Sequence, residues 1–258
     1  MCLLVVLSRV HSGFPLIVAA NRDEFLAREA TPMTTLRDAG PKILGGRDEL
    51  AGGTWLAVNE HGLVAGLTNA PMTRAGRDPQ KKSRGELPLA LAAHASAEAA
   101  AISFRATIHA ADYNPCWLLA GDRGVLLYVD LTVPAEPLVE ALPPGIHVLE
   151  NRPLRAASPK ADAVRAALEG CQGWSESELR ARLDALLRDH AIPAAARDFP
   201  RGDPPRPIET EARCVHAGPY GTKSAQTVFV PADPAERPHI RFAAGPSCVT
   251  PWQDAPGW

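Results

Sequence analysis

Short apolar runs, separated by turn-forming residues, recur along most of the chain. The first two runs, residues 2–8 and 16–20, flank a segment that contains Gly13 and Pro15, and this pattern predicts a β-hairpin at the start of the chain. The same pattern predicts further strands at residues 54–58, 63–68, 116–120, 125–130, 147–150, 227–230 and 239–243. Strands therefore make up much of the predicted structure.

Helical patterns interrupt these strands in two places. Residues 85–111 are rich in Ala, Leu and Glu and predict two helices, the second of them capped by Ser96. Later, Ser158 followed by Pro159 predicts a helix start, and a capping box that begins at Ser175 precedes leucines at helical spacing. The order of strands, helix pair, strands, helix pair and strands favours an α+β protein with helices packed on sheets over a βαβ series.

Composition and charge narrow the classes of function. The net charge of −2 gives no support for binding to nucleic acid or to an anionic membrane, and nucleotide-binding fingerprints of the P-loop and G-x-G-x-x-G kinds are absent. No apolar stretch reaches the length of about 18 residues that a membrane span needs. We expect a single domain over residues 1–258, with exposed polar loops at 72–84 and 192–207.

The cysteines and histidines give no sign of a cross-linked or metal-binding framework. The five cysteines are odd in number, widely spaced and without a C-x-x-C pair, so neither a disulfide framework nor a thiolate metal site is predicted. The eight histidines show neither H-x-H nor H-E-x-x-H spacing. Because the chain also opens without a signal segment, a reducing compartment and a cytoplasmic location are expected.

Cys2 has a special position, because only Met1 precedes it. Removal of Met1 would leave a thiol and a free α-amine on one residue. The amine has an ordinary pKa of about 7.7–8.0, so near neutral pH it can accept the thiol proton and act as the base for this nucleophile. The alternative is that Cys2 is a small apolar residue that opens a buried strand.

The segment Asn21-Arg22-Asp23-Glu24 directly follows the second predicted strand. The hairpin brings this segment beside the start of the first strand, so Arg22 and Asp23 are expected next to Cys2. A guanidinium there lowers the pKa of a thiol, and a carboxylate can orient the amine. The alternative is a solvated turn at the end of a strand.

Six ordered motifs make the sequence recognisable. They stand at residues 1–3, 20–25, 52–56, 67–69, 84–87 and 220–222. On these motifs the chain resembles the NRDE family, which includes the transport and Golgi organisation 2 proteins. It is similar more widely to N-terminal nucleophile hydrolases of the penicillin V acylase and bile-salt hydrolase kind, and this resemblance implies a four-layer αββα sandwich.

The wider resemblance also implies roles for the residues around the amino terminus. Cys2 matches the nucleophile, and Arg22 matches the arginine beside it. Asp23 resembles the acid that contacts the amine. The spacing from arginine to acid is shorter here, however, so Glu24 is an alternative for that role.

Three later residues complete the implied set. Asn69 and Asn151 resemble the two asparagines that bind the oxyanion, for which turn capping is the alternative role. Lys223 stands where the family has a late arginine. Lysine keeps the charge of arginine but lacks its planar fork, so it supports a site less rigidly.

Two functions remain open at this point. The first is an amidase-like hydrolase that acts on a small linear amide through an acyl-Cys2 intermediate, without a cofactor. The second, implied by the association of NRDE relatives with haem trafficking, is a non-catalytic carrier that holds haem or a lipid-like ligand non-covalently in the same pocket.

Overall fold

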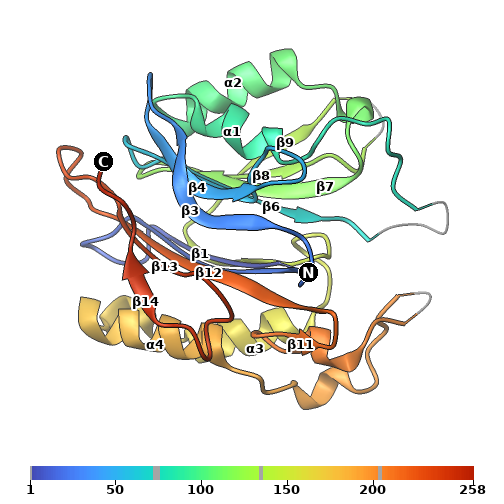
Figure 1. The fold of residues 1–258 in the computed structure, drawn as a ribbon. Coiled ribbons are helices and arrows are strands. Elements are labelled where there is room, and N and C mark those ends of the chain that lie inside the picture. Colours follow the sequence, from blue (N-terminus) through green and yellow to red (C-terminus); the bar gives the residue numbers. More distant parts are fainter. Residues whose placement is uncertain (1, 72–75, 134–135, 203–204) are drawn as a thin grey trace.

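The structure is a computed structural model that describes residues 2–71, 76–133, 136–202 and 205–258. Two sheets lie face to face, and a pair of helices covers the outer face of each (Figure 1). The layers therefore follow the order helices, sheet, sheet, helices. This order confirms the expected α+β class and the αββα arrangement.

Both sheets are antiparallel throughout their named strands. The first sheet contains, in spatial order, β10 (Gly145–Leu149), β1 (Leu3–Ser8), β2 (Leu16–Phe25), β12 (Tyr220–Val230), β13 (His239–Ala243) and β14 (Trp252–Asp254), with β11 (His216–Ala217) beside β12. The second sheet contains β3 (Ala30–Arg37), β4 (Ile43–Asp48), β5 (Leu56–Asn59), β6 (Val64–Asn69), β7 (Cys116–Gly121), β8 (Leu126–Asp130) and β9 (Leu138–Leu142).

The helices begin where the sequence predicted. The second sheet is covered by α1 (Glu86–Ala92) and α2 (Ala97–Thr107), and the first by α3 (Pro159–Ala167) and α4 (Glu176–Arg188) (Figure 1). Short 3₁₀ helices are η1 (Ala110–Asp112), η2 (Cys171–Gly173), η3 (Ala194–Ala196) and η4 (Ile208–Glu211). Ser96, Ser158 and Ser175 each accept a hydrogen bond from the backbone N–H three residues later, at 3.1–3.2 Å, which confirms the three predicted caps.

Strand β1 explains why the chain opens on an unbroken apolar run. It lies between β10 and β2, inside the first sheet. Leu4 and Val6 enter the core between the two sheets, whereas Leu3, Val5 and Leu7 enter the core against α3 and α4. Because both faces of β1 are buried, apolar residues occupy every position, and the start of this strand lies deep in the molecule.

Strand β2 is longer than predicted. The expected end at residue 20 is wrong, since the strand continues to Phe25 and pairs with β12 over this extension. The polar segment Asn21–Glu24 is therefore part of a strand and not a solvated turn. Asn21, Arg22 and Asp23 are all buried there.

Strands β3, β4, β9, β11 and β14 were not predicted, and the last two are only two and three residues long. Strand β3 forms one edge of the second sheet and β9 the other, and their side chains are mostly half-buried or exposed, so neither has a continuous apolar run. Strand β4 contains the pair Gly45-Gly46, which hides its strand pattern. The strand predicted at residues 227–230 begins much earlier, since β12 starts at Tyr220, and the other predicted strands are present with small shifts at their ends.

The two predicted loops carry little regular structure. Residues 72–75 and 203–204 lie outside the described residues. Residues 76–84 form neither helix nor strand, and the other described part of 192–207 contains only η3. Within the described part of the chain, no helix combines the length and apolar character that crossing a bilayer requires.

Two of the recognised motifs meet through a pair of glycines. A Cβ on Gly53 would lie 2.5 Å from a backbone atom of Gly85, and the N–H of Thr54 donates to the carbonyl of Gly85 at 2.9 Å. Only glycine lets two backbones approach so closely. This contact joins the segment before β5 to the start of α1.

Candidate active site

The pairing of β1 places Cys2 beside one predicted site residue. Leu3 of β1 faces Asn21 of β2, and continuing this register to the start of the chain sets Cys2 opposite Arg22. On the other side of β1, Leu4 faces Leu149, where β10 ends. The chain turns after that point, since Glu150 pairs with Arg152, and Asn151 lies in this turn.

The surroundings of Cys2 decide the ionisation of its thiol. Cys2 is half-buried, and the backbone N–H of Asp23 forms a hydrogen bond with its sulfur. Burial raises the pKa of the Cys2 thiol, and this effect outweighs the positive charge of Arg22 and the hydrogen bond, which lower it. The charge of Arg22 lowers the pKa of the thiol, as expected, but the net shift of this pKa is upward and not downward.

Asp23 is the acidic residue at the thiol. Its side chain is 3% exposed, and the hydroxyl of Thr222 donates to its Oδ1 at 2.6 Å. The hydroxyl of Tyr220 donates to the Asp23 carbonyl at 2.8 Å. Burial raises the pKa of the Asp23 carboxyl, while the charge of Lys160 and the bond from Thr222 oppose that rise. A carboxyl held in this way can exchange a proton near Cys2.

Glu24 is placed differently. Its Oε1 accepts from the N–H of Phe25 at 2.8 Å, and its Oε2 lies 4.0 Å from Nε of Arg28. Asp23, by contrast, acts on the Cys2 thiol through its charge and through its backbone N–H. These contacts favour Asp23 over Glu24 as the acid beside the thiol.

Arg22 is fixed by contacts with the second sheet. Only 4% of its side chain is exposed, and its Nη2 lies 3.1 Å from Oδ2 of Asp48. Its guanidinium also lies 4.4 Å from the ring centroid of Trp55. An ion pair and a cation–π contact hold the guanidinium between the sheets, where it can act on the thiol.

The two predicted asparagines meet at the ends of β6 and β10. The amide nitrogen of Asn151 donates to the backbone carbonyl of Asn69, and the hydroxyl of Thr68 donates to the carbonyl of Glu150 at 2.9 Å. The Asn151 side chain is buried, and its Oδ1 has no hydrogen-bond partner among the described residues. Asn69 thus takes part in this contact through its backbone, and Asn151 through its side chain.

Lys223 lies at a β-bulge in β12, between Thr222 and Ser224. Its Nζ donates to the carbonyls of Leu26 and Arg28, at 2.7 and 2.6 Å. Burial and the nearby charge of Arg22 lower the pKa of Lys223. These contacts anchor the turn after β2, so Lys223 supports the strand that carries Arg22 and Asp23.

A buried lysine near the site was not predicted. Lys160, in the first turn of α3, is fully buried, and its Nζ has no hydrogen-bond partner in the described part of the chain. Burial would raise the pKa of Glu150, but the charges of Lys160 and Arg152 hold it below its ordinary value. The only sequence signal was a lysine directly after the helix-starting Pro159, which also fits a solvated helix end.

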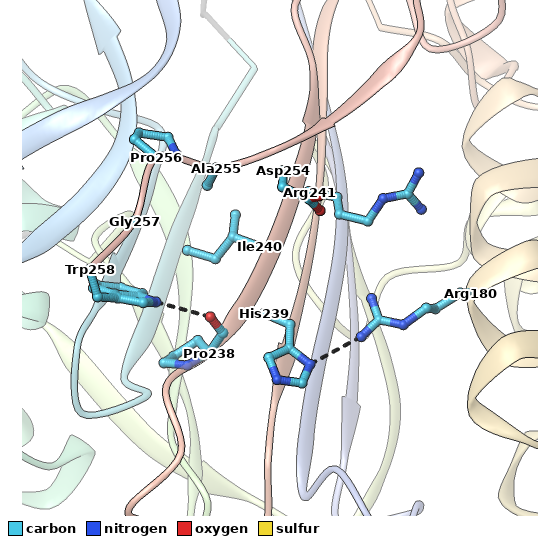
Figure 2. A pocket seen from close by; sticks show the side chains of 10 residues that line it. All are labelled: Arg180, Pro238, His239, Ile240, Arg241, Asp254, Ala255, Pro256, Gly257 and Trp258. Atoms are coloured by element: carbon cyan, nitrogen blue, oxygen red, sulfur yellow. Dashed lines mark hydrogen bonds between the residues drawn. The ribbon is translucent and has the colours of Figure 1, made fainter.

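Two further features lie outside this set of residues. A surface pocket has a volume of about 590 Å³. In it Trp258 Nε1 lies 3.0 Å from the carbonyl oxygen of Pro238, to which it donates, and Arg180 lies 3.3 Å from His239 (Figure 2). None of the six predicted site residues lines it. A metal ion could be held elsewhere, by a group of side chains that spacing did not reveal: His190, Cys214, His216 and Cys248.

Comparison with solved structures supports the architecture. An N-acylethanolamine-hydrolyzing acid amidase ortholog from Caenorhabditis elegans matches with a TM-score of 0.57 and 13% identity, over 99% of this chain and 100% of that one. A variant of the conjugated bile acid hydrolase from Clostridium perfringens matches with a TM-score of 0.55 and 10% identity, over 100% and 97%. The chain therefore has the αββα fold of the N-terminal nucleophile hydrolases.

Sequence comparison identifies the family. The chain is 30% identical over 243 residues to the Transport and Golgi organization protein 2 homolog of Bos taurus, covering 86% of this chain and 84% of that protein. The Homo sapiens homolog is 29% identical over 240 residues with the same coverage. The family model described as Transport and Golgi organisation 2 matches residues 1–237. The chain belongs to the Transport and Golgi organisation 2 family.

Proposed function

We propose that this protein is an amidase-like hydrolase that cleaves a small linear amide through an acyl-Cys2 intermediate. The observation that carries the proposal is the position of the Cys2 thiol, opposite Arg22 in the strand register and hydrogen-bonded to the backbone N–H of Asp23. Nucleophilic catalysis on an amide needs a thiolate, a proton acceptor and donors for the developing oxyanion. This arrangement brings candidates for each role to one end of β1.

The chemistry begins with the removal of Met1, which converts the backbone nitrogen of Cys2 into an amine. The amine takes the thiol proton, the sulfur attacks the carbonyl carbon, and an amide N–H of Asn151 can donate to the oxyanion. The C–N bond then breaks, the leaving amine takes the proton, and a thioester remains. Water attacks the thioester, releases the acid and returns the proton to Cys2.

The positive charge of Arg22 stabilises the thiolate in this scheme. Burial keeps the Cys2 thiol protonated, so a thiolate formed during the reaction needs compensation. Arg22 supplies a charge that is already fixed by Asp48 and Trp55 and needs no rearrangement. Asp23 can then orient the α-ammonium that forms when the thiol loses its proton.

The same surroundings disfavour the alternative of a non-covalent haem or lipid-like carrier. A carrier of a large apolar ligand needs an apolar pocket at the site. Arg22, Asp23 and Lys160 are buried charged residues around Cys2 or its neighbours, and such groups are costly to hold without a role. Titration with haemin, followed by the Soret band, tests the carrier directly.

The decisive experiment uses N-acyl amides, including N-acylethanolamines and conjugated bile acids. We expect intact-mass analysis to show that Met1 is absent, and rapid quenching to reveal an acyl adduct on the peptide that begins with Cys2. Cys2→Ala should abolish turnover, whereas Cys171→Ala, which removes a different free thiol, should retain it. Turnover that survives Cys2→Ala would exclude the proposed nucleophile.

A further inference from the structure

Four side chains with metal-binding atoms gather at one end of the first sheet. His190 follows α4, Cys214 and His216 lie before and within β11, and Cys248 lies in the segment between β13 and β14. One ligand atom from each residue is within 4.8 Å of all the others. Two sulfurs and two imidazole nitrogens therefore converge from three separate parts of the chain.

The separations of these atoms fit a tetrahedral ion. Nε2 of His216 lies 3.9 Å from Sγ of Cys214 and 3.3 Å from Sγ of Cys248. For Zn–S bonds of about 2.3 Å and Zn–N bonds of about 2.0–2.1 Å, the edge between sulfur and nitrogen of a tetrahedron is about 3.6 Å. The two observed edges lie on either side of this value. The widest separation in the group, up to 4.8 Å, exceeds such an edge by about 1 Å, so rotation of the side chains has to bring the four atoms closer together.

The orientation of His190 also suits a ligand. Its Nδ1 lies 3.0 Å from the carbonyl oxygen of Cys214, and a carbonyl can only accept, so Nδ1 is the protonated nitrogen. In the neutral ring Nε2 then carries the lone pair that a metal needs. A backbone carbonyl that fixes the ring in this way is typical of histidines that bind metal ions.

The segments that carry the ligands are already fixed to one another. The N–H of Cys214 donates to the carbonyl of Asp189 at 2.9 Å, and Arg213 forms an ion pair with the Asp189 side chain. The hydroxyl of Ser247, next to Cys248, donates to the carbonyl of Leu187 at 2.6 Å. These contacts fix the three segments to one another, so little chain entropy remains to be lost on binding.

Solvent can reach this group of side chains. His190 and His216 are exposed and Cys248 is half-buried, so an ion can enter from solvent, whereas Cys214 is buried.

We propose that His190, Cys214, His216 and Cys248 form a Zn²⁺ site. Two sulfurs and two nitrogens in a tetrahedron are the ligand set of a structural zinc ion, and a closed set of four protein ligands leaves no position for a substrate. Binding replaces two S–H bonds with two Zn–S bonds and releases two protons. The ion ties the end of α4 to β11 and to the segment before β14, independently of any reaction at Cys2.

The test measures metal content and coordination in the full chain. After dialysis against metal-free buffer we expect one zinc per chain by elemental mass spectrometry, and a higher Tm than in the chelator-treated protein. Replacement by Co²⁺ should give the intense visible bands of a tetrahedral ion and the near-ultraviolet band of thiolate bonded to cobalt. A cobalt spectrum without these bands would overturn the proposal.

Variants separate this site from adventitious binding. Cys248→Ser and His190→Ala should each lower the zinc content several-fold, whereas the matched controls Cys171→Ala and His61→Ala should keep it. His190 is exposed, so its replacement should leave the fold intact, and circular dichroism checks this. Equal zinc content in His190→Ala and His61→Ala would contradict the proposal. A disulfide between Cys214 and Cys248, seen as a mass two hydrogens below that of the reduced chain, would also contradict it, because no thiolate would be left to bind zinc.

Discussion

Replacing Thr222 by valine tests the hydrogen bonds that hold Asp23. The Thr222 side chain is 1% exposed, and its hydroxyl donates to Asp23 at 2.6 Å and accepts from the N–H of Val215 at 2.9 Å. A hydrogen bond to a charged group contributes about 1.5–3 kcal/mol, and a buried N–H without a partner costs about 1–3 kcal/mol. Because valine has nearly the same shape, we expect a loss of roughly 3 kcal/mol in the free energy of unfolding at neutral pH.

The loss should depend on pH, because Thr222 bonds the charged form of Asp23. Burial raises the pKa of Asp23 in the folded state, so the folded chain binds this proton more tightly and stability falls as pH rises through the folded pKa. The hydrogen bond from Thr222 limits this rise of the pKa, and Thr222→Val removes the hydrogen bond. The cost of Thr222→Val should therefore be larger near neutral pH than near pH ~4, where the unfolded carboxyl titrates.

Urea unfolding followed by tryptophan fluorescence at these two pH values measures both effects. Thr222→Ser is the matched control, since it keeps the hydroxyl and loses only a methyl group. If Thr222→Val and Thr222→Ser differ by less than about 0.5 kcal/mol at both pH values, the hydroxyl does not hold Asp23 and the reasoning fails.

Three other predictions address the thiol, the oxyanion and the core. Arg22→Ala should raise the pH midpoint for alkylation of Cys2 by iodoacetamide, because the charge of Arg22 lowers the pKa of the thiol, and Arg22→Lys should restore much of it. Asn151→Ala should slow amide hydrolysis by about 10²–10³ in initial-rate assays if its amide binds the oxyanion; an unchanged rate would limit it to its contact with the backbone. Leu183→Ala, at a fully buried position of α4, should lower the free energy of unfolding by about 2–5 kcal/mol in urea, and a loss comparable with that of a surface substitution would refute its place in the core.

Local patterns in the sequence predicted the elements whose stability is decided locally. The caps at Ser158 and Ser175 and the opening hairpin depend on residues a few positions apart, and they are present as predicted. The extension of β2 could not be predicted in this way. Arg22 and Asp23 are tolerated inside a strand because Asp48 and Thr222 supply their partners, and Thr222 lies about two hundred positions away.

The candidate sites, too, could be predicted only where neighbours in the sequence determine the geometry. The predicted hairpin brought Arg22 and Asp23 to Cys2, since the two strands that it joins are close in the sequence, and in the structure both residues act on the thiol. The convergence of His190 with Cys248 depends on where the end of α4 meets the segment before β14, which no spacing rule contains. A weak signal was present in Cys214-x-His216, because side chains two positions apart on an extended chain lie on one side.

The contact between Gly53 and Gly85 bears on what membership of a family says about activity. Both glycines belong to motifs by which the sequence is recognised, yet their task is to let two backbones touch at the start of α1. Selection for folding alone can preserve such a contact, so a relative that lacks the thiol can still carry the family motifs. Family membership therefore does not establish a reaction at the amino terminus, and the residue at the position of Cys2 has to be inspected in each relative.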